Sequence, residues 1–517
     1  MIENAPAPAE DNSIIPAVYT YWGQFIDHDL TANTDRDSKT SDITKRPLTP
    51  VPPDEVTRAL HNLRRPTLDL DSLYGNGPDF VEPKSKDAGF YDGPRFRIGK
   101  NTDAPQIPGI KIPPEGDLDR DLPRIGRLLE DKVITDDVLP EALKNDVNKA
   151  TRAFIGDLRN DENLIIAQFH LAFLRFHNKV VVWLEKNDDS YKRDKAKLYK
   201  RARQLTRWHY QWLVVHDYLK TVTLSGIVDK IRLGGPKHYK PLDGGELFMP
   251  LEYSVAAFRF GHSMVRAGYD HNRNFGKRFD GTDPVQPFAS FDDLFRFTGN
   301  GFARDPNDRT KSSPNPFRGT PTLPFNWIIE WDRLTNKTDP DENHSARKID
   351  TRLAPPITEM VNEGTNKSIQ DDANKELRVM LRHLARRNLL RGYLLSIPTG
   401  QSDAAEMGVP VLSETELRQG NTDELNTALE QGGFLQHTPL WYYVLKEAEV
   451  RANGNSLGEL GSRILCETII GLLRNTPNSF LNKKGGLGPL RGREAGQWRS
   501  DRHHPRLPEV HGRPRLI

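Results

Sequence analysis

The fold of this chain is decided by the stretch YTYWGQFIDHDL, residues 19–30. A helix with 3.6 residues per turn places Gln24, Asp27 and His28 of this stretch on one face. Asp29 turns about 100° away from His28 and faces elsewhere. An amide, a carboxylate and an imidazole therefore share a face that apolar side chains support from behind. This pattern indicates a buried polar site rather than a solvated surface.

Other interpretations of the same stretch remain open at this point. A single Asp-His-Asp is common, and a lone histidine is more often a hydrogen-bonded structural residue than a catalyst. Metal-dependent phosphohydrolases also use His-Asp pairs. Other segments of the chain must therefore decide between these interpretations.

Length and composition restrict the class of protein. The 517 residues could form several domains or one large helical unit around a cofactor. With 36% apolar and 28% charged residues, the chain can bury a core beneath a polar surface. No apolar run is long enough to cross a membrane. The net charge of +2 indicates no general nucleic-acid role, and residues 1–10 show no secretory signal.

The single cysteine, Cys466, limits the chemistry further. It excludes an intramolecular disulfide and a cysteine-rich metal site. A cytosolic or bacterial protein is favoured over a disulfide-stabilised secreted animal enzyme.

The fold class predicted is mainly α, with one large helical domain, long irregular loops and little β-structure. No internal repeat or series of strands is visible. The domain prediction is an arm over residues 1–13, a domain over 14–482, and a disordered basic Pro/Gly-rich tail over 483–517. Helices are expected within residues 141–186, 192–222, 254–265, 374–396, 412–418, 423–430, 437–452 and 456–474.

Further polar residues lie outside the opening stretch. Residues 65–75 offer several oxygens of the kind that Ca²⁺ prefers, although an acidic loop capping a helix is the simpler interpretation. Arg159 and Glu162, three residues apart, could project together or form a surface ion pair. His262 lies in an apolar segment and could bind a metal, although a satisfied core histidine is the default. His170 and His177 are interpreted as core or supporting residues.

Three segments together resemble the animal-type haem peroxidases of the peroxidase–cyclooxygenase superfamily. They are WGQFIDHD at residues 22–29, GDLRNDE at 156–162 and FRFGHS at 258–263. Residues 68–75, 176–178 and 388–392 match in the same order, and the similarity covers roughly residues 14–480. This ordered co-occurrence displaces the phosphohydrolase interpretation, and the lack of disulfides resembles a bacterial member.

The resemblance implies a role for each matching residue. His262 corresponds to the proximal ligand of the haem iron, and Asn388 to the residue that holds its second nitrogen. His28 corresponds to the distal base that moves a proton of H2O2. Arg159 corresponds to the cation that stabilises negative charge as the O–O bond breaks. Gln24 corresponds to the residue that orders water or a bound anion. Arg259 suits a haem propionate.

Covalent attachment of haem b is also implied. Asp27 and Glu162 match the carboxylates that form ester bonds to haem methyl groups in many members, although they could only hydrogen-bond a non-covalent haem. In one branch of the family, a methionine directly after the glutamate forms a third, sulfonium link to the haem. Asn163 stands at this position, so this link and efficient chloride oxidation are not expected.

A calcium site is implied on the opposite side of the opening helix. Asp29 matches a calcium ligand, and Asp69, Asp71 and Thr67 would complete the site. Arg65 stands where the family often has threonine, so only its carbonyl oxygen could serve.

The function implied is reduction of H2O2 through a ferryl species. The oxidised donor would be iodide, bromide, thiocyanate or a phenol. A fatty-acid dioxygenase ranks lower because Ile329 occupies the position of the tyrosine that carries the radical in those enzymes. An adhesion or binding protein on a peroxidase scaffold is the non-enzymatic alternative.

Overall fold

The computed structural model describes most of the chain. The described residues are 3–4, 11–32, 42–44, 46–60, 62–81, 86–103, 117–242, 245–275, 288–299, 302–304, 312–314, 317, 320–335, 344–360, 363 and 371–483. The predicted tail lies outside them apart from Lys483. Within this part of the chain, no helix is both long and apolar enough to cross a membrane.

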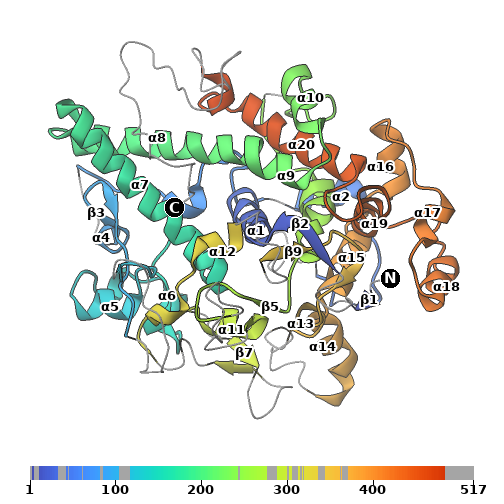
Figure 1. Ribbon diagram of the computed structural model, residues 1–517, viewed down its shortest axis with the longest axis horizontal. Helices are drawn as coiled ribbons and strands as arrows, with labels where there is room; N and C mark the ends of the chain where they lie inside the picture. Colours follow the sequence, from blue (N-terminus) through green and yellow to red (C-terminus); the bar gives the residue numbers. More distant parts are fainter. Residues whose placement is uncertain are drawn as a thin grey trace.

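Long helices form the centre of the molecule, where α8 packs against α7 (Figure 1). Their bounds are α1 Val18–Leu30, α7 Leu164–Asn187, α8 Lys195–Leu213, α15 Leu384–Leu394, α19 Leu440–Ala452 and α20 Glu459–Asn475. Helix α7 is buried on every face over its first three turns, as its nearly continuous apolar sequence predicts. The mainly helical fold predicted from the sequence is confirmed.

Shorter helices surround this centre. They are α2 Pro53–Ala59, α3 Asp71–Tyr74, α4 Asp87–Phe90, α5 Ile125–Glu130, α6 Glu141–Lys144, α9 Leu219–Val222, α10 Ile227–Gly234, α11 Phe291–Arg296, α12 Trp331–Thr335, α13 Pro355–Thr358, α14 Lys375–Arg382, α16 Gly400–Glu406, α17 Glu414–Arg418 and α18 Asp423–Gln431. The sequence predicts two helices within residues 141–186, separated by a break at 153–163, with the second running over 164–185. The structure has the short helix α6 and then α7.

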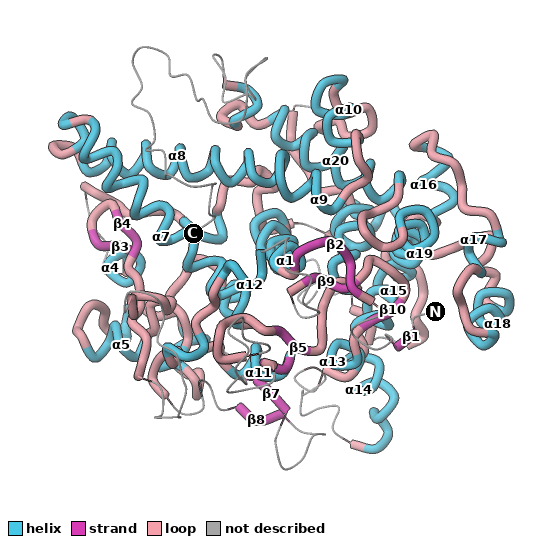
Figure 2. Tube along the Cα trace, in the orientation of Figure 1, coloured by secondary structure: helices cyan, strands magenta, loops and turns pink. Residues whose placement is uncertain are grey.

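The β-structure consists of short paired strands, which Figure 2 shows in magenta. The pairs are β1 Glu3–Asn4 with β10 Arg352–Leu353, β2 Asn12–Pro16 with β9 Ser345–Arg347, β3 Tyr91–Asp92 with β4 Arg95–Phe96, β5 Gly268–Tyr269 with β6 Ala289–Ser290, and β7 Phe302–Arg304 with β8 Ser312–Pro314. Strand β2 crosses the boundary expected at residue 13, so part of the predicted arm is paired with the domain.

Residues 254–265 are mostly helical, as expected, but they do not form one regular α-helix. A π-helical turn, η9 (Glu252–Ala256), is followed by a 3-10 segment, η10 (Ala257–His262). The change occurs at Ala256, whose φ of −123° and ψ of −77° leave the α-helical region. Apolar periodicity alone does not distinguish these related helices, and π-helical turns occur frequently at functional sites.

Helix α1 is the element that joins the predicted site segments. It contacts α7, the 3-10 helix η6 (Leu158–Asp161), η10 and α3. Helix α7, η6 and η10 each lie more than a hundred residues from α1 in the sequence, so these contacts bring distant segments together.

Candidate functional site

The polar face of α1 lies inside the molecule. His28 is only 5% exposed, whereas Gln24 and Asp27 are half-buried. Phe25 and Ile26, which flank this face, are fully buried and fix the rotation of the helix. The face therefore presents its polar groups to an interior region rather than to open solvent.

The imidazole of His28 is held by a residue that sequence reasoning missed. Its Nδ1 lies 2.8 Å from Oδ1 of Asn160 on η6. Because a carbonyl oxygen only accepts, Nδ1 carries the proton and Nε2 keeps its lone pair. Burial, assisted by the charge of Arg159, lowers the pKa of His28 to about 4. At neutral pH the imidazole is uncharged and can accept a proton at Nε2.

Arg159 is fixed against the C-terminal end of α1. Its Nη2 donates to the carbonyl oxygens of His28 at 2.9 Å and Thr31 at 2.7 Å. Its Nε donates to Oδ1 of Asp157 at 3.1 Å. Burial opposes ionisation of Asp157, but the hydrogen bonds and charge of Arg159 keep the pKa of that carboxyl well below its usual range. Arg159 is therefore a cation at a helix C-terminus, where the helix dipole favours it.

The side chain of Gln24 connects α1 to the start of α7. Its Nε2 donates to Oε2 of Glu162 at 3.3 Å, and its Oε1 accepts from Nδ2 of Asn163 at 3.0 Å. Asn163 also caps α7 by accepting from the amide of Ile166. The predicted Glu162 thus lies beside Gln24, and Asn163 has a contact that the sequence did not suggest.

The second predicted carboxylate, Asp27, lies one turn further along α1. Its Oδ1 accepts a hydrogen bond of 3.0 Å from the hydroxyl of Thr31. Asp27 and Glu162 are both half-buried, so each residue keeps partial contact with solvent.

The segment before Asn163 is anchored by a buried ion cluster. Nη1 of Arg124 lies 2.7 Å from Oδ2 of Asp161, and its Nη2 lies 2.6 Å from Oδ1 of Asp121. All three side chains are at most 3% exposed. Removal of one member of a buried ion pair costs about 3–5 kcal/mol, so this cluster fixes the backbone of η6.

The second predicted histidine, His262, is the last residue of η10 and is half-buried. Nδ2 of Asn388, on α15, lies 2.9 Å from Nδ1 of this histidine. Nη1 of Arg259 donates to Oδ1 of Asn388 at 3.5 Å. The predicted trio His262, Asn388 and Arg259 is therefore brought together.

The predicted calcium ligands lie near one another without forming a metal cage. Oδ2 of Asp29 accepts from the backbone amide of Leu70 at 3.1 Å, so Asp29 faces away from His28 as predicted. Asp69 pairs with Arg207 at 3.1 Å, and Asp71 with Arg203 at 3.4 Å. Among the residues that the structure describes, no three acidic, histidine or cysteine side chains form a group that could hold a metal ion.

The remaining predicted calcium ligands belong to the same loop. The hydroxyl of Thr67 donates to Oδ2 of Asp69 at 2.7 Å, and the carbonyl of Arg65 accepts from the amide of Thr67 at 2.8 Å. Burial, together with the charge of Asp71, raises the pKa of Asp29 to about 7. The loop is thus crowded with carboxylates and compensated by arginines.

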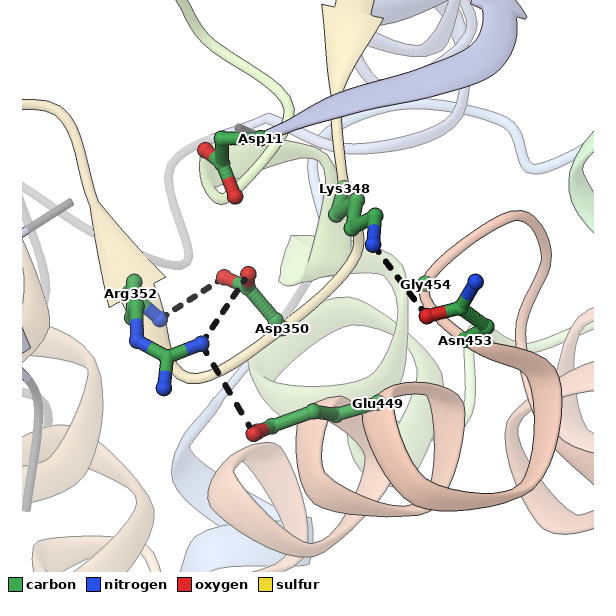
Figure 3. Close-up of a pocket in the computed structure, with 7 residues that line it drawn as sticks. All are labelled: Asp11, Lys348, Asp350, Arg352, Glu449, Asn453 and Gly454. Atoms are coloured by element: carbon green, nitrogen blue, oxygen red, sulfur yellow. Dashed lines mark hydrogen bonds and ion pairs between the residues drawn. The ribbon is translucent and has the colours of Figure 1, made fainter. Parts of the chain in front are cut away.

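A polar cavity of about 190 Å³ lies elsewhere, near the C-terminal end of α19 (Figure 3). Arg352 approaches both Asp350 at 3.9 Å and Glu449 at 3.8 Å. Lys348 donates to Asn453 at 3.1 Å. None of the predicted site residues lines this cavity, and its ion pairs join β10 to α19, so we assign it to the charge network between these elements.

Comparison with known proteins supplies the family. A family profile described as animal haem peroxidase matches residues 4–296. The chain belongs to this family.

Curated relatives match over parts of their length. The chain is 27% identical over 259 residues to the peroxidase mlt-7 of Caenorhabditis elegans, covering 48% of this chain and 33% of the relative. It is 30% identical over 118 residues to the chorion peroxidase of Aedes aegypti, covering 21% and 14% respectively. The chain thus spans a third or less of each of these relatives.

Solved structures share the fold. Peroxidase A of Dictyostelium discoideum superimposes with a TM-score of 0.52 at 15% identity, over 93% of this chain and 84% of that one. A fatty acid alpha-dioxygenase of Oryza sativa gives 0.50 at 11% identity, over 92% and 71%. At these identities the likeness concerns the fold alone.

The residues around His262 can be tested against an iron porphyrin, the group that the family implies. A Cβ added to the neighbouring Gly261 would meet no atom within 4 Å, so the backbone next to His262 borders open space. Binding of iron through Nε2 requires a proton on Nδ1 and an acceptor facing it. The amide nitrogen of Asn388 faces Nδ1 instead, and a half-turn of this amide supplies the acceptor. The side-chain set therefore fits once Asn388 has rotated.

Proposed function

We propose that the chain is a haem-dependent peroxidase that reduces H2O2, with haem held between His28 and His262. The observation that carries this proposal is the position of α1. Helix α1, which carries His28, contacts both η6, which carries Arg159, and η10, which carries His262. A scaffold with no chemistry would not need all three residues on elements that contact one another.

His28 is the residue that moves the proton. Its Nε2 lone pair, directed by the Nδ1 hydrogen bond to Asn160, accepts a proton from the peroxide and returns it to the leaving oxygen. Haem, when bound, supplies the redox chemistry that accepts two oxidising equivalents.

Arg159 and Gln24 prepare the surroundings of His28. The guanidinium of Arg159 is half-buried and held by Asp157 and two carbonyl oxygens, so its charge favours negative charge that develops nearby. The amide of Gln24, already bonded on both sides, is a rigid group that orders water or an anion.

His262, Asn388 and Arg259 hold the haem from the opposite side. His262 binds the iron, Asn388 keeps the imidazole oriented, and Arg259 pairs with a propionate. Asp27 and Glu162 attach the haem by ester bonds. Asn163, which bonds Gln24, cannot form a sulfonium link, so chloride is a poor donor and iodide, bromide, thiocyanate or phenols are the preferred ones.

Calcium at Asp29, Thr67, Asp69, Asp71 and the carbonyl of Arg65 belongs to the same proposal. The carboxylates of Asp29, Asp69 and Asp71 act on one another in this loop, and this crowding supports a cation here, which would displace Arg203 and Arg207 from their carboxylates. EDTA should lower the melting temperature of the protein. An unchanged melting temperature and haem spectrum in EDTA would remove calcium from the proposal.

A fatty-acid dioxygenase is the second candidate, because solved dioxygenases share the fold. Ile329 is 1% exposed and carries no phenol, so a tyrosyl radical cannot form at that position. Oxygen uptake with palmitate, measured beside peroxide turnover, decides between the two activities.

The absorption spectrum of the purified protein, before and after extraction with acidified organic solvent, tests the proposal. A Soret band that stays with the polypeptide supports the esters at Asp27 and Glu162. A band that leaves with the solvent makes the haem non-covalent. A protein that shows no band even after haem is supplied would not be a haem peroxidase.

A further inference from the structure

We infer that Asn160 is the positioning residue that fixes the proton of His28, through a buried chain of hydrogen bonds that ends at His170. The inference rests on the proposed function, because it explains how His28 stays ready to accept a proton. Neither Asn160 nor this connection was expected from the sequence.

The bond between Asn160 and His28 selects one form of the imidazole. Oδ1 of Asn160 lies 2.8 Å from Nδ1 of His28 and can only accept. The form with its proton on Nε2 would place two acceptors against each other in a region where Asn160 is 0% exposed. A buried polar group without a hydrogen-bond partner is destabilising. Nε2 is therefore kept free of a proton, as a general base requires.

His170 pairs with the other end of the Asn160 amide. Nδ2 of Asn160 lies 3.0 Å from Nδ1 of His170, and an amide nitrogen only donates. His170 is 0% exposed on α7, and its ring packs edge-on against Phe25 of α1, with ring centroids 6.2 Å apart. In this orientation both ends of the amide are paired, the oxygen with Nδ1 of His28 and the nitrogen with Nδ1 of His170.

The backbone at Asn160 is held independently. Its neighbour Asp161 pairs with buried Arg124 at 2.7 Å and accepts from the amide of Ala153 at 3.2 Å. The preceding residue, Arg159, is fixed by Asp157 and the end of α1. One turn of 3-10 helix thus delivers a cation and an imidazole-orienting amide to the same helix.

Cyanide binding to the haem-loaded protein tests this inference without relying on turnover. Hydrogen cyanide must give up a proton when it binds ferric haem, whereas carbon monoxide on ferrous haem needs no base. Asn160→Leu removes the acceptor at nearly the same volume. Its cyanide affinity should fall on the order of 10- to 100-fold, part of the roughly 100- to 10,000-fold that general acid–base catalysis contributes. Its carbon monoxide affinity should not change.

Two further variants separate positioning from packing. Asn160→Asp keeps an acceptor toward Nδ1 of His28 and should return the cyanide affinity to near the wild-type value. Asn272→Leu removes an amide that is equally buried, at 3% exposure, but bonds the carbonyls of Asn326 and Ile328. This control should bind cyanide as the wild type does.

Each outcome is decisive. Wild-type cyanide affinity in Asn160→Leu would overturn the inference, and so would equal losses in Asn160→Leu and Asn160→Asp. Failure of the wild-type chain to bind haem would instead overturn the proposed function. If Asn160→Leu does not fold, Asn160→Ala removes the same acceptor without an apolar branch against the two imidazoles and is judged by the same comparison.

Discussion

The two histidines of the candidate site are held in opposite ways. At His28 the amide oxygen of Asn160 faces Nδ1, whereas at His262 the amide nitrogen of Asn388 faces Nδ1. His28 lies on a regular α-helix and is 5% exposed. His262 ends an irregular segment and is half-buried.

Under the proposed function, this difference separates a finished site from one that changes when haem binds. Nδ1 of His28 already carries the proton, which leaves Nε2 free to act as a base. With the amide nitrogen of Asn388 facing Nδ1 of His262, the proton of that imidazole is on Nε2, the nitrogen proposed to bind iron, until Asn388 rotates.

The largest expected effect is on the His262 side. His262→Ala removes the nitrogen that would bind iron, so haem should be lost or its spectrum strongly altered. The Soret band of the purified variant measures this. A normal band would mean that another residue binds the iron.

His28→Ala should affect the rate of peroxide turnover rather than haem binding. The variant should keep its Soret band and lose about 100- to 10,000-fold in the rate of H2O2-driven oxidation, because its proton acceptor is gone. Stopped-flow mixing with H2O2 gives this rate. Unchanged turnover would refute the role of His28 as base and remove the contrast between the two sides.

Asn388 variants sharpen the comparison. Asn388→Leu cannot accept from Nδ1 of His262, so haem affinity should fall about 10- to 100-fold. Asn388→Asp offers an acceptor in either orientation and should bind haem as readily as the wild type. Haem titration followed at the Soret maximum distinguishes them, and equal affinity in both variants would mean that rotation of Asn388 is irrelevant.

The smallest effect concerns pH. Burial lowers the pKa of His170 to about 3, below its ordinary value of about 6.5. Burial of the neutral His170 therefore leaves the free energy of unfolding undiminished above pH 6.5. As the pH falls toward 3, protonation of His170 in the unfolded chain lowers this free energy by up to about 1.4 kcal/mol per pH unit. His170→Gln, which keeps an acceptor for Asn160, should show a shallower fall in the free energy of unfolding between pH 7 and 5. Parallel curves would contradict this.

The sequence predicted the elements whose periodicity is strong. Helix α1 and helix α7 appear within one or two residues of their expected bounds, because long apolar patterns leave few alternatives. The π-helical and 3-10 turns before His262 were not predicted. They depend on packing against α15 and α19, which no local pattern records.

The same limit applies to the site. His28, Arg159 and His262 were named because they belong to recognisable motifs. Asn160 lies inside one of those motifs but attracted no attention, since its role depends on His170, ten residues away on another helix. The arginine partners of Asp69 and Asp71 were missed for the same reason, because α8 brings them from over a hundred residues away.

The π-helical turn Glu252–Ala256 makes the direction of His262 a matter of residue count. A π-turn contains about one residue more than an α-turn, and each residue of an α-helix rotates the following side chains by about 100°. Deletion of the extra residue would let an ordinary α-helical turn form, because the shorter turn still completes one rotation. Any other change of length would rotate His262, the proposed iron ligand, by about 100° for each residue, so the length of this segment is constrained even where its individual side chains are not.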